Sequence, residues 1–484
     1  MELKLFRNRK RGKLKGLIAK TRATISRLWL LVTSFLVVFS IVKLIMFVHT
    51  WKHEVSNPKD HPHYGTSLHP KSEYISNGYL MISTNGGLNQ MRAGICDMVA
   101  IARYMNATLV VPKFDRTSLW KDQSEFEDVF DVDYFIDSLI DEVRIIKELP
   151  LHLYKKMKGG ECISIHSSLK DDVKKEYCLS FPPGSWSTME FYHKRVLPLM
   201  KKHEVLNFTK SDFRLANNEL PIQVQKLRCR VNYDAMRFVS PIKKMGEKIV
   251  ELLRQRGPIL ALHLRYEKDI LAFTGCNEGV TPHEALDLQK MRDNISWWKN
   301  KHPNSTAERL AGSCPLTPEE TALILKALNI HPNTQIYIAA GDTYGGDRRL
   351  ASLQEAFPNL VRKENLLPST EFLAFKNHST QMAAVDYIVS VSSDIFFPTY
   401  GGNMAHLVEG HRRYMGFQKT IKPNRRLLVK LIDKYRRGAL SWQEFSILVK
   451  ESHKNRVGNP VKRVVIPGKP KEEEYFWSNP QECL

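Results

Sequence analysis

The sequence lacks the short motifs that mark several large enzyme classes. Its 484 residues contain no P-loop, no H-E-x-x-H and no G-x-S-x-G sequence, which argues against an NTPase, a zinc metalloprotease and a serine hydrolase. None of the seven cysteines forms a C-x-x-C pair, which argues against a zinc ribbon or a thioredoxin-like site. Internal repeats and low-complexity tracts are also absent. The 43% hydrophobic content is ordinary for a globular enzyme.

Positive charge is concentrated at the N-terminus. The first 27 residues hold ten Lys or Arg against the single acid Glu2, so they supply +9 of the formal net charge of +21. The remainder shows no basic face interleaved with aromatic residues, which excludes nucleic acid as the expected partner.

An apolar run follows at residues 28–48, with Lys43 near its end. A run of this length can cross a hydrocarbon core of ~30 Å as a helix, and it is too long for the apolar part of a cleaved signal peptide. The basic flank predicts a cytosolic tail at residues 1–27 and a luminal remainder, which is a type II signal anchor. Residues 49–77 have little periodic pattern and are expected to form a luminal stem.

A luminal chain is expected to form disulfides and to carry N-glycans. The expected bridges are Cys162–Cys178 and Cys276–Cys314, although sequence alone does not fix the pairing. The odd number of cysteines leaves at least one thiol unpaired. The Asn-x-Ser/Thr sequons after the anchor are at Asn106, Asn207, Asn294, Asn304 and Asn377.

Strands and helices alternate in two stretches of the remaining chain, which predicts two parallel sheets with helical crossovers. The first stretch has strands at 78–84 and 108–112, and between them apolar residues fall at helical spacing from Arg92 to Tyr104. The second has strands at 258–264, 335–340 and 387–391, with helices at 318–328, at 348–357 and from Asn403 onward. We therefore expect an α/β fold with two Rossmann-like domains facing a cleft, at 78–238 and 239–484.

Three segments at the ends of predicted strands are candidates for ligand binding, because open parallel sheets bind ligands beyond the carboxyl ends of their strands. In the first, Gly86 and Gly87 precede a helix whose N-terminal N–H groups favour an anion, and Asn89, Gln90 and Arg92 could donate hydrogen bonds. A plain tight turn before a capped helix is the alternative.

The second segment is His263-Leu264-Arg265-Tyr266-Glu267-Lys268-Asp269, where polar groups follow an apolar strand. His263 and Arg265 point to the same side of an extended chain. A guanidinium there can bind a diphosphate and stabilise the charge that develops as a nucleotide leaves. The alternative is a surface salt-bridge cluster of Arg265, Glu267, Lys268 and Asp269.

The third segment runs from Asp386 through Ser392, Ser393 and Thr399 to a glycine pair before a helix. Hydroxyl groups and glycines before a helix suit phosphate oxygens. Asp386 is equally suited to cap a helix or to join a buried ion pair. A D-x-D sequence at Asp131-Val132-Asp133 offers too few oxygen ligands for a divalent cation, so no metal site is expected.

Together these segments resemble the plant O-fucosyltransferase family, close to its rhamnogalacturonan I rhamnosyltransferase branch. The resemblance covers nearly all of residues 78–484. Its motifs are Gly86-Gly-Leu-Asn-Gln-Met-Arg92, His263-Leu-Arg-Tyr-Glu-Lys-Asp269, Ala272-Phe273, Gly275-Cys276, Cys314-Pro-Leu-Thr-Pro318, Gln335-Ile-Tyr-Ile-Ala-Ala-Gly341, Pro398-Thr-Tyr400, Gly402-Asn-Met404, Glu409-Gly-His-Arg-Arg413 and Asn479-Pro-Gln-Glu-Cys483.

The resemblance implies a GT-B fold and an inverting, metal-independent glycosyltransferase of the Golgi membrane that uses a nucleotide sugar and no cofactor. It implies that Arg265 grips the β-phosphate, that His263 lines the donor site, and that Asn89 faces the reacting sugar. Asp386, Ser392 and Ser393 would hold the base and the phosphates. The remaining expected donor-site residues are Gly86, Gly87, Leu264 and Thr399.

Two questions stay open at this stage. Some animal relatives place a glutamate where this chain has Gly86, so either Glu267 or Asp269 is the general base, or departure of the nucleotide precedes attack. A carboxylate such as Asp386 could accept two hydrogen bonds from guanine, which favours GDP-fucose as the donor. The branch resemblance favours UDP-rhamnose and a pectic rhamnogalacturonan acceptor.

A non-catalytic partner that binds glycans or Golgi enzymes is a further alternative, motivated by the missing base.

Overall fold

The computed structural model describes residues 75–116, 122–157, 162–164, 177–217, 220–375, 377–416 and 419–459. They belong to one compact unit, Ser72–Leu484. The predicted tail, the anchor and nearly all of the stem lie outside the described residues. Among the residues that are described, no helix is long and apolar enough to cross a membrane.

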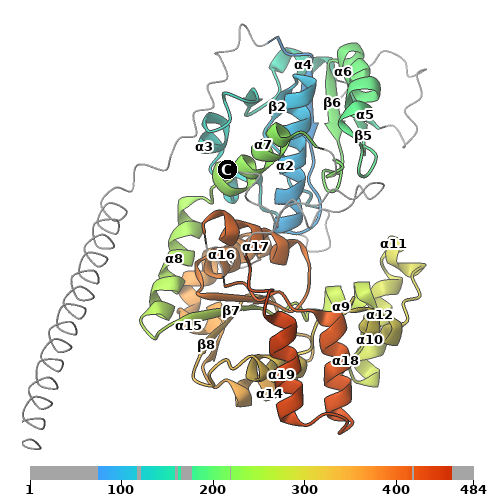
Figure 1. Cartoon of the computed structure of the whole chain (residues 1–484). Helices are drawn as coiled ribbons and strands as arrows, with labels where there is room; N and C mark the ends of the chain where they lie inside the picture. The colour runs from blue at the N-terminus through green and yellow to red at the C-terminus, as the bar shows by residue number, and fades with distance from the viewer. Residues whose placement is uncertain are drawn as a thin grey trace, which may run out of the picture. The chain divides into compact units, whose positions relative to one another are not determined.

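The first sheet has six parallel strands in the order β3-β2-β1-β6-β5-β4 (Figure 1). Its central strand β1 pairs with β2 and β6, so that Tyr79 lies opposite both Thr108 and Val205. The strands are β1 (Tyr79–Ile82), β2 (Thr108–Val110), β3 (Ile145–Ile146), β4 (Ile163–Ser164), β5 (Cys178–Phe181) and β6 (Val205–Phe208).

Helix α2 (Leu88–Met105) is the main helix of this sheet, and 15 of its 18 residues are buried. It ends at Asn106, whose left-handed backbone (φ 51°) is one that asparagine tolerates. The predicted strand–helix–strand unit at 78–112 is therefore confirmed. The other helices of this half are α3 (Val132–Asp137), α4 (Leu151–Lys156), α5 (Met189–Phe191), α6 (Leu197–His203) and α7 (Ile222–Arg230), with a short 3-10 turn at Phe126–Asp128 and π-helical turns at Tyr192–Val196 and Val231–Ala235.

The second sheet has four parallel strands in the order β10-β7-β8-β9. All five residues of the central strand β7 are buried, as the continuous apolar run predicts. The strands are β7 (Ile259–His263), β8 (Gln335–Ile338), β9 (Leu360–Val361) and β10 (Ile395–Pro398). The α/β character and the parallel sheets are thus confirmed.

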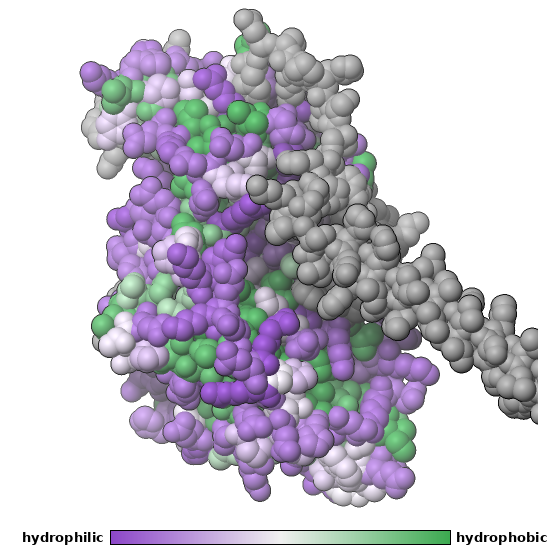
Figure 2. Space-filling view, turned by 90° about the vertical axis from the view of Figure 1, so that its left-hand side faces the viewer, coloured by the Kyte–Doolittle hydropathy of each residue, from purple (hydrophilic) through white to green (hydrophobic). Residues whose placement is uncertain are grey.

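The helices of the second half include the predicted α13, α14 and α17. Helix α8 is strongly amphipathic and buries its apolar side. The face of the molecule on which α8 lies is mostly hydrophilic, with small and separate apolar areas (Figure 2). The helices are α8 (Ser240–Arg254), α9 (Lys268–Thr274), α10 (Pro282–Asp293), α11 (Ser296–Lys299), α12 (Ser305–Ala311), α13 (Pro318–Ala327), α14 (Gly346–Ala356), α15 (Lys363–Leu366), α16 (Ser379–Ser392), α17 (Asn403–Tyr414), α18 (Arg425–Arg436) and α19 (Trp442–His453), with a 3-10 segment at Ser369–Phe375.

The predicted strand at 387–391 is wrong, because these residues form the last turns of helix α16. Thr380, Ala384, Tyr387 and Val391 are buried at helical spacing, while the run of β-branched residues suggests a strand. The strand that pairs with β7 is β10, a few residues further on. Tertiary burial therefore overrides the local propensity of this segment.

Side chains from other parts of the chain satisfy both ends of α16. At its start, Asp122 accepts hydrogen bonds from the Thr380 N–H (2.5 Å) and the Ser379 hydroxyl (3.1 Å). At its end, the buried Arg412 guanidinium donates to the carbonyl oxygens of Ser390 (3.1 Å) and Val391 (3.0 Å). Unpaired backbone groups at helix ends are costly when buried, so these contacts stabilise a helix whose N-cap residue, His378, makes no side-chain cap.

Both expected disulfides, Cys162–Cys178 and Cys276–Cys314, are present. Cys96 is a free thiol buried in helix α2. Its burial raises the pKa of the thiol well above the usual range, so Cys96 is a packing residue and not a nucleophile.

The cap formed by Asp122 gives a test of this fold. Burial raises the pKa of Asp122, but the hydrogen bonds from Thr380 and Ser124 outweigh it and leave the pKa below its usual value. We expect Asp122→Ala to lower the free energy of unfolding by about 1–2 kcal/mol at pH 7. Because the folded pKa is depressed, the contribution of the charged cap is complete above the unfolded pKa and is lost as pH falls through the folded value, below about pH 4. Denaturant titrations at pH 7 and pH 3 measure both effects.

The matched control is Asp293→Ala at the exposed last residue of α10, which should change stability by less than about 0.5 kcal/mol. An equal loss in both variants would contradict the capping role of Asp122.

Candidate active site

The carboxyl ends of β7 and β10 bring four predicted site residues together. Pro398 of β10 pairs with His263, and the Thr399 hydroxyl accepts a hydrogen bond from the Arg265 N–H at 2.9 Å. The same hydroxyl donates to the His263 carbonyl oxygen at 3.1 Å. Leu264 is fully buried in the core beneath them. His263, Leu264, Arg265 and Thr399 therefore form one structural cluster.

His263 is a buried and neutral member of this cluster. Its Nδ1 lies 2.8 Å from the Ala339 carbonyl oxygen, which can only accept, so this nitrogen carries the proton. Burial lowers the pKa of His263 below its usual value, which keeps the ring uncharged at neutral pH. Its Nε2 is consequently a hydrogen-bond acceptor.

Two carboxylates hold the Arg265 guanidinium. Its Nη1 and Nη2 bind the Asp269 carboxylate in a bidentate pair (2.9 and 2.6 Å), and Nη1 lies 2.8 Å from Glu267 Oε2. Burial acts to lower the pKa of Arg265, but Glu267 and Asp269 outweigh it and raise the pKa above its usual range. The side chain is 21% exposed, so a ligand can reach it.

The predicted salt-bridge alternative is therefore realised for three of its four residues. Lys268 instead forms an ion pair with Asp287 at 2.7 Å. Arg265 is charged but already paired, and an anion must exchange with at least one carboxylate to use both of its nitrogens.

The Gly86–Gly87 turn places the N-terminus of α2 without a side-chain cap. Gly86 has a φ of +88°, which glycine adopts without strain, and Gly87 is the N-cap. Asn89 in the first turn is 7% exposed, and its Oδ1 has no hydrogen-bond partner among the described residues. Gln90 donates to Asp212 at 2.8 Å. The first turn of α2 thus leaves the buried amide oxygen of Asn89 unpaired among the described residues, while the Gln90 and Met91 N–H groups donate to the Gly87 carbonyl oxygen.

Arg92 has a structural position instead. Its guanidinium lies over the Tyr387 ring at 4.2 Å and donates to the Asn232 carbonyl oxygen at 2.6 Å. It is 1% exposed. This cation–π contact joins α2 to α16 and leaves Arg92 buried away from solvent.

The third predicted segment is divided by the structure. Asp386 is buried in α16, and its two oxygens accept hydrogen bonds from the Tyr337 hydroxyl (2.7 Å) and the Lys363 ammonium (2.9 Å). Burial raises its pKa, and these two partners oppose that effect. Asp386 is therefore a buried ion-pair partner, one of the two structural alternatives that its sequence context offers.

Ser392 and Ser393 lie at the end of α16, not at the end of a strand. The Ser392 carbonyl oxygen accepts a hydrogen bond from Arg254 at 3.0 Å. The buried Ser393 hydroxyl donates to the carbonyl oxygens of Ser390 (2.9 Å) and Ile395 (3.1 Å). In this structure both serines shape the connection from α16 to β10.

Tyr400, from the Pro398-Thr-Tyr400 motif, and Arg425, which no sequence signal links to the site, join the cluster. The Arg425 guanidinium lies 5.1 Å from the centroid of the Tyr400 ring and donates to the Gly312 carbonyl oxygen at 2.8 Å. Burial raises the pKa of the Tyr400 phenol, and the Arg425 and Arg265 cations oppose it. Tyr400 therefore contacts the Arg425 cation at the glycine-rich entry to α17.

A pocket of about 1410 Å³ lies beyond the carboxyl ends of β8 and β9. Its lining includes Ile338, Leu360 and Phe372 together with Arg362 and His378, but none of the residues predicted for the donor site. Gly341 connects the two regions, because its N–H donates to Glu267 and its carbonyl oxygen accepts from Arg362. The pocket therefore adjoins the Arg265 cluster.

The remaining predicted positions have local roles. Asp131 caps α3 through the Tyr134 N–H, and Asp133 forms an ion pair with Lys147, so neither points to a shared cation. The side chains of three predicted glycosylation sites, Asn106, Asn207 and Asn304, form hydrogen bonds to Ile75, Ser180 and Ala307. Asn294 and Asn377 are exposed.

The left-handed turn before α2 is testable. A methyl group at Gly86 would meet the Gln90 side chain at 2.1 Å and would occupy a φ of +88°. We expect Gly86→Ala to lower the free energy of unfolding by about 1–2 kcal/mol, chiefly through backbone strain. Gly402 precedes α17 at a φ of −99° with its nearest neighbour at 3.5 Å, so Gly402→Ala should cost less than about 0.5 kcal/mol. Thermal denaturation of the two variants compares them, and equal stability would contradict the strain.

Comparison with known proteins places these residues in a family. Residues 79–415 match the model for GDP-fucose protein O-fucosyltransferase. Rhamnogalacturonan I rhamnosyltransferase 1 of Arabidopsis thaliana is 57% identical over 418 residues, covering 86% of this chain and 79% of that protein. Rhamnogalacturonan I rhamnosyltransferase 4 of the same plant is 52% identical over 416 residues (86% and 83%).

O-fucosyltransferase 7 of Arabidopsis thaliana is 45% identical over 450 residues, covering 90% of this chain and 75% of that protein. Among solved structures, POFUT1 in complex with GDP-fucose aligns with a TM-score of 0.39 at 13% identity, covering 70% of this chain and 95% of that one. This structural similarity is too low to carry an argument. The family model and the sequence identities establish the assignment: the chain is a glycosyltransferase and belongs to the O-fucosyltransferase family.

Proposed function

We propose that this enzyme transfers rhamnose from UDP-rhamnose to a hydroxyl group of the pectic glycan rhamnogalacturonan I, with inversion at the anomeric carbon. The observation that carries the transferase chemistry is Arg265, a partly exposed cation at the carboxyl end of the buried strand β7. Relatives at 52–57% identity are named rhamnogalacturonan I rhamnosyltransferases, which supports this donor and acceptor.

In this proposal the two sheets form the halves of a GT-B fold, and Arg265 binds the β-phosphate of the donor. As the bond from the sugar to the diphosphate breaks, negative charge grows on the leaving oxygen, and a preorganised guanidinium stabilises it. The uncapped N-terminus of α17 lies next to Thr399 and Tyr400, where its N–H groups add to the positive potential. The protein itself supplies this charge, so we propose that catalysis needs no metal ion.

The ion pairs of Glu267 and Asp269 bear on the general base. Both carboxylates are engaged by Arg265, so neither is free to contact an acceptor hydroxyl while its ion pair is intact. When a diphosphate takes over Arg265, one carboxylate is released near the reacting centre. We therefore propose that departure of the nucleotide precedes proton transfer, and that Glu267 or Asp269 accepts the proton late in the reaction.

The position of Asp386 bears on the choice of donor. The argument for guanine requires a carboxylate with both oxygens free, whereas those of Asp386 are bound to Tyr337 and Lys363. Without that contact nothing in the described site favours guanine over uracil. We propose that the base enters the pocket beyond β8 and β9, which combines apolar side chains such as Phe372 with polar groups such as Asn365.

GDP-fucose remains the second candidate donor, because the family model that matches residues 79–415 describes a GDP-fucose protein O-fucosyltransferase. We propose that the reaction takes place in the Golgi lumen, with the chain anchored through residues 28–48. The basic N-terminal flank of that apolar run supports this orientation.

Replacement of Arg265 tests the catalytic proposal. Arg265→Lys keeps the charge but loses the two-nitrogen fork, and we expect kcat/KM to fall by about 10²–10³-fold, as for loss of one transition-state donor. The matched control is Arg348→Lys, since Arg348 is half exposed and pairs with Glu284 away from the cluster. Its activity should stay within twofold of wild type. A folded Arg265→Lys variant with full activity would exclude this mechanism and would indicate that Arg265 has no catalytic role.

A donor panel tests the sugar. The full-length protein in detergent is incubated with rhamnogalacturonan I oligosaccharides and either UDP-rhamnose or GDP-fucose, and products are followed by mass spectrometry. We expect addition of one rhamnose from UDP-rhamnose, and unchanged rates after treatment with EDTA. Transfer from GDP-fucose alone would favour the second candidate, and loss of activity with EDTA that added Mn²⁺ restores would contradict metal independence.

A further inference from the structure

The chain between β7 and α13 carries an aromatic cluster on its surface. The rings of Phe273, Trp297 and Trp298 lie within 5.2–6.0 Å of one another, measured between ring centroids. Trp298 is buried, but Trp297 is 65% exposed. An indole that leaves most of its surface in water adds little to folding, so the fold alone does not account for Trp297.

One basic side chain lies against these rings, and others are exposed on the same segment. Lys301 Nζ lies 4.2 Å from the centroid of the Phe273 ring and 5.6 Å from that of Trp297. Lys290 and Lys299 are also exposed on the same short segment. Residues 290–301 contain four Lys or Arg and the single acid Asp293, so the segment has a surplus of three positive charges. The exposed Trp297 ring therefore lies near the Lys301 cation, on a segment whose positive surplus favours an anionic ligand.

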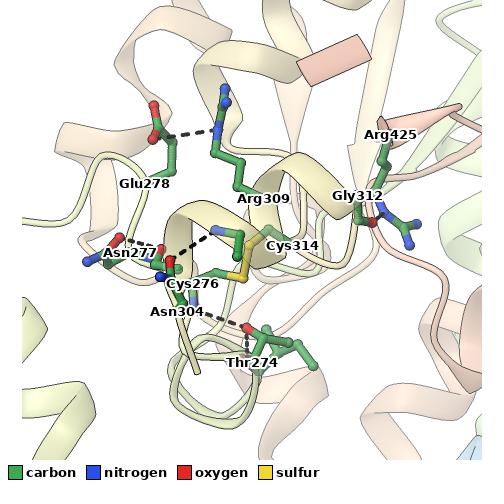
Figure 3. Close-up of a disulfide and its surroundings, with 12 residues drawn as sticks. Thr274, Cys276, Asn277, Glu278, Asn304, Arg309, Gly312, Cys314 and Arg425 are labelled. Carbon is green, nitrogen blue, oxygen red and sulfur yellow. Dashed lines mark hydrogen bonds and ion pairs between the residues drawn. A yellow bond between two sulfur atoms is a disulfide. The ribbon is translucent and has the colours of Figure 1, made fainter. Parts of the chain in front are cut away.

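The segment is fixed to the rest of the fold at its base. The Cys276–Cys314 disulfide joins the residues that follow α9 and α12, and it closes a loop with a sequence separation of 38 (Figure 3). Arg309 within this loop binds Glu320 and Asp433, and Arg425 binds the Gly312 carbonyl oxygen (Figure 3 shows the latter contact). The disulfide and these contacts fix both ends of the segment that carries the aromatic cluster, so the cluster has a defined position.

Helix α9 connects the cluster to the proposed catalytic centre. Asp269, the bidentate partner of Arg265, and Phe273 are four residues apart in this helix. Residues at this spacing lie on the same face, about 6 Å apart along the helix axis. A chain-like acceptor that reaches the centre near Arg265 can therefore extend along α9 to Phe273 and Trp297.

We propose that Phe273, Trp297 and Lys301 form a binding site for the acceptor chain, an anionic polysaccharide that contains uronic acid residues. Sugar rings present an apolar face of C–H groups that stacks on exposed aromatic rings, and the carboxylates pair with Lys301 and its basic neighbours. This inference rests on the proposed function, because it extends the proposed active site by a binding site for the acceptor chain. It adds a subsite away from the reacting atoms that selects an acidic chain.

Binding of oligogalacturonides of defined length to the full-length protein tests the subsite. All proteins carry Asn294→Gln, so that a glycan three residues before Trp297 cannot change access to it. We expect Trp297→Ala to weaken binding about tenfold, equivalent to ~1.4 kcal/mol. Lys301→Gln should weaken it about threefold and reduce its dependence on salt. With active enzyme, both changes should raise KM for the acceptor without changing kcat or KM for the donor.

The matched control is Trp442→Ala, which removes a 40%-exposed tryptophan from α19 and should leave oligogalacturonide binding unchanged.

Wild-type affinity and acceptor KM in Trp297→Ala would overturn the proposal. Equal affinity of wild type for a neutral galactan oligomer would overturn the charge selection. A change in oligomeric state with unaltered glycan affinity would assign Trp297 to a protein contact and would also overturn it. Binding is measured without donor, so an enzyme that transfers no sugar would contradict the proposed function and still leave the subsite open to this test.

Discussion

The arrangement of the site depends on the hydrogen bonds that side chains from other parts of the chain make to both ends of helix α16. The Arg412 guanidinium donates to the carbonyl oxygens at the end of the helix and to that of Ser393 (2.5 Å), so the chain must turn at this point. The turn sends β10 alongside β7 and sets the Thr399 hydroxyl against the Arg265 backbone. Burial lowers the pKa of Arg412 to about 10, which still leaves it charged at neutral pH. A cation against helix C-terminal carbonyls is also favoured by the helix dipole.

The same helix joins distant parts of the chain. Asp122 caps its start, and Tyr387 near its end lies under Arg92 of α2. Each contact links a residue before position 130 to one after position 370. Loss of one contact therefore affects the packing of both sheets, since α16 also packs against β7 and α8.

Sequence reasoning predicted the elements whose pattern is local. The apolar run of β7 and the helical spacing in α2 are visible in the sequence because burial repeats along each element. Segment 387–391 was mispredicted because its caps come from residues 122 and 412, which no local pattern reveals. The partners of Asp386, Tyr337 and Lys363, are likewise brought together only by the fold. For the candidate site, sequence spacing is sufficient for His263 and Arg265, whereas the contact of Arg425 with Tyr400 requires the structure.

The Cys276–Cys314 bridge has a practical consequence for preparing this protein. A disulfide forms in an oxidising compartment, and the reducing cytosol of a bacterial host keeps thiols apart. Protein produced there can retain both parallel sheets and still lack the disulfide at the base of the segment that follows β7, although both cysteines are buried in the core of the second sheet. Solubility and a normal circular dichroism spectrum would not reveal that defect. A secretory host, or a count of free thiols before any assay, is therefore the appropriate quality criterion.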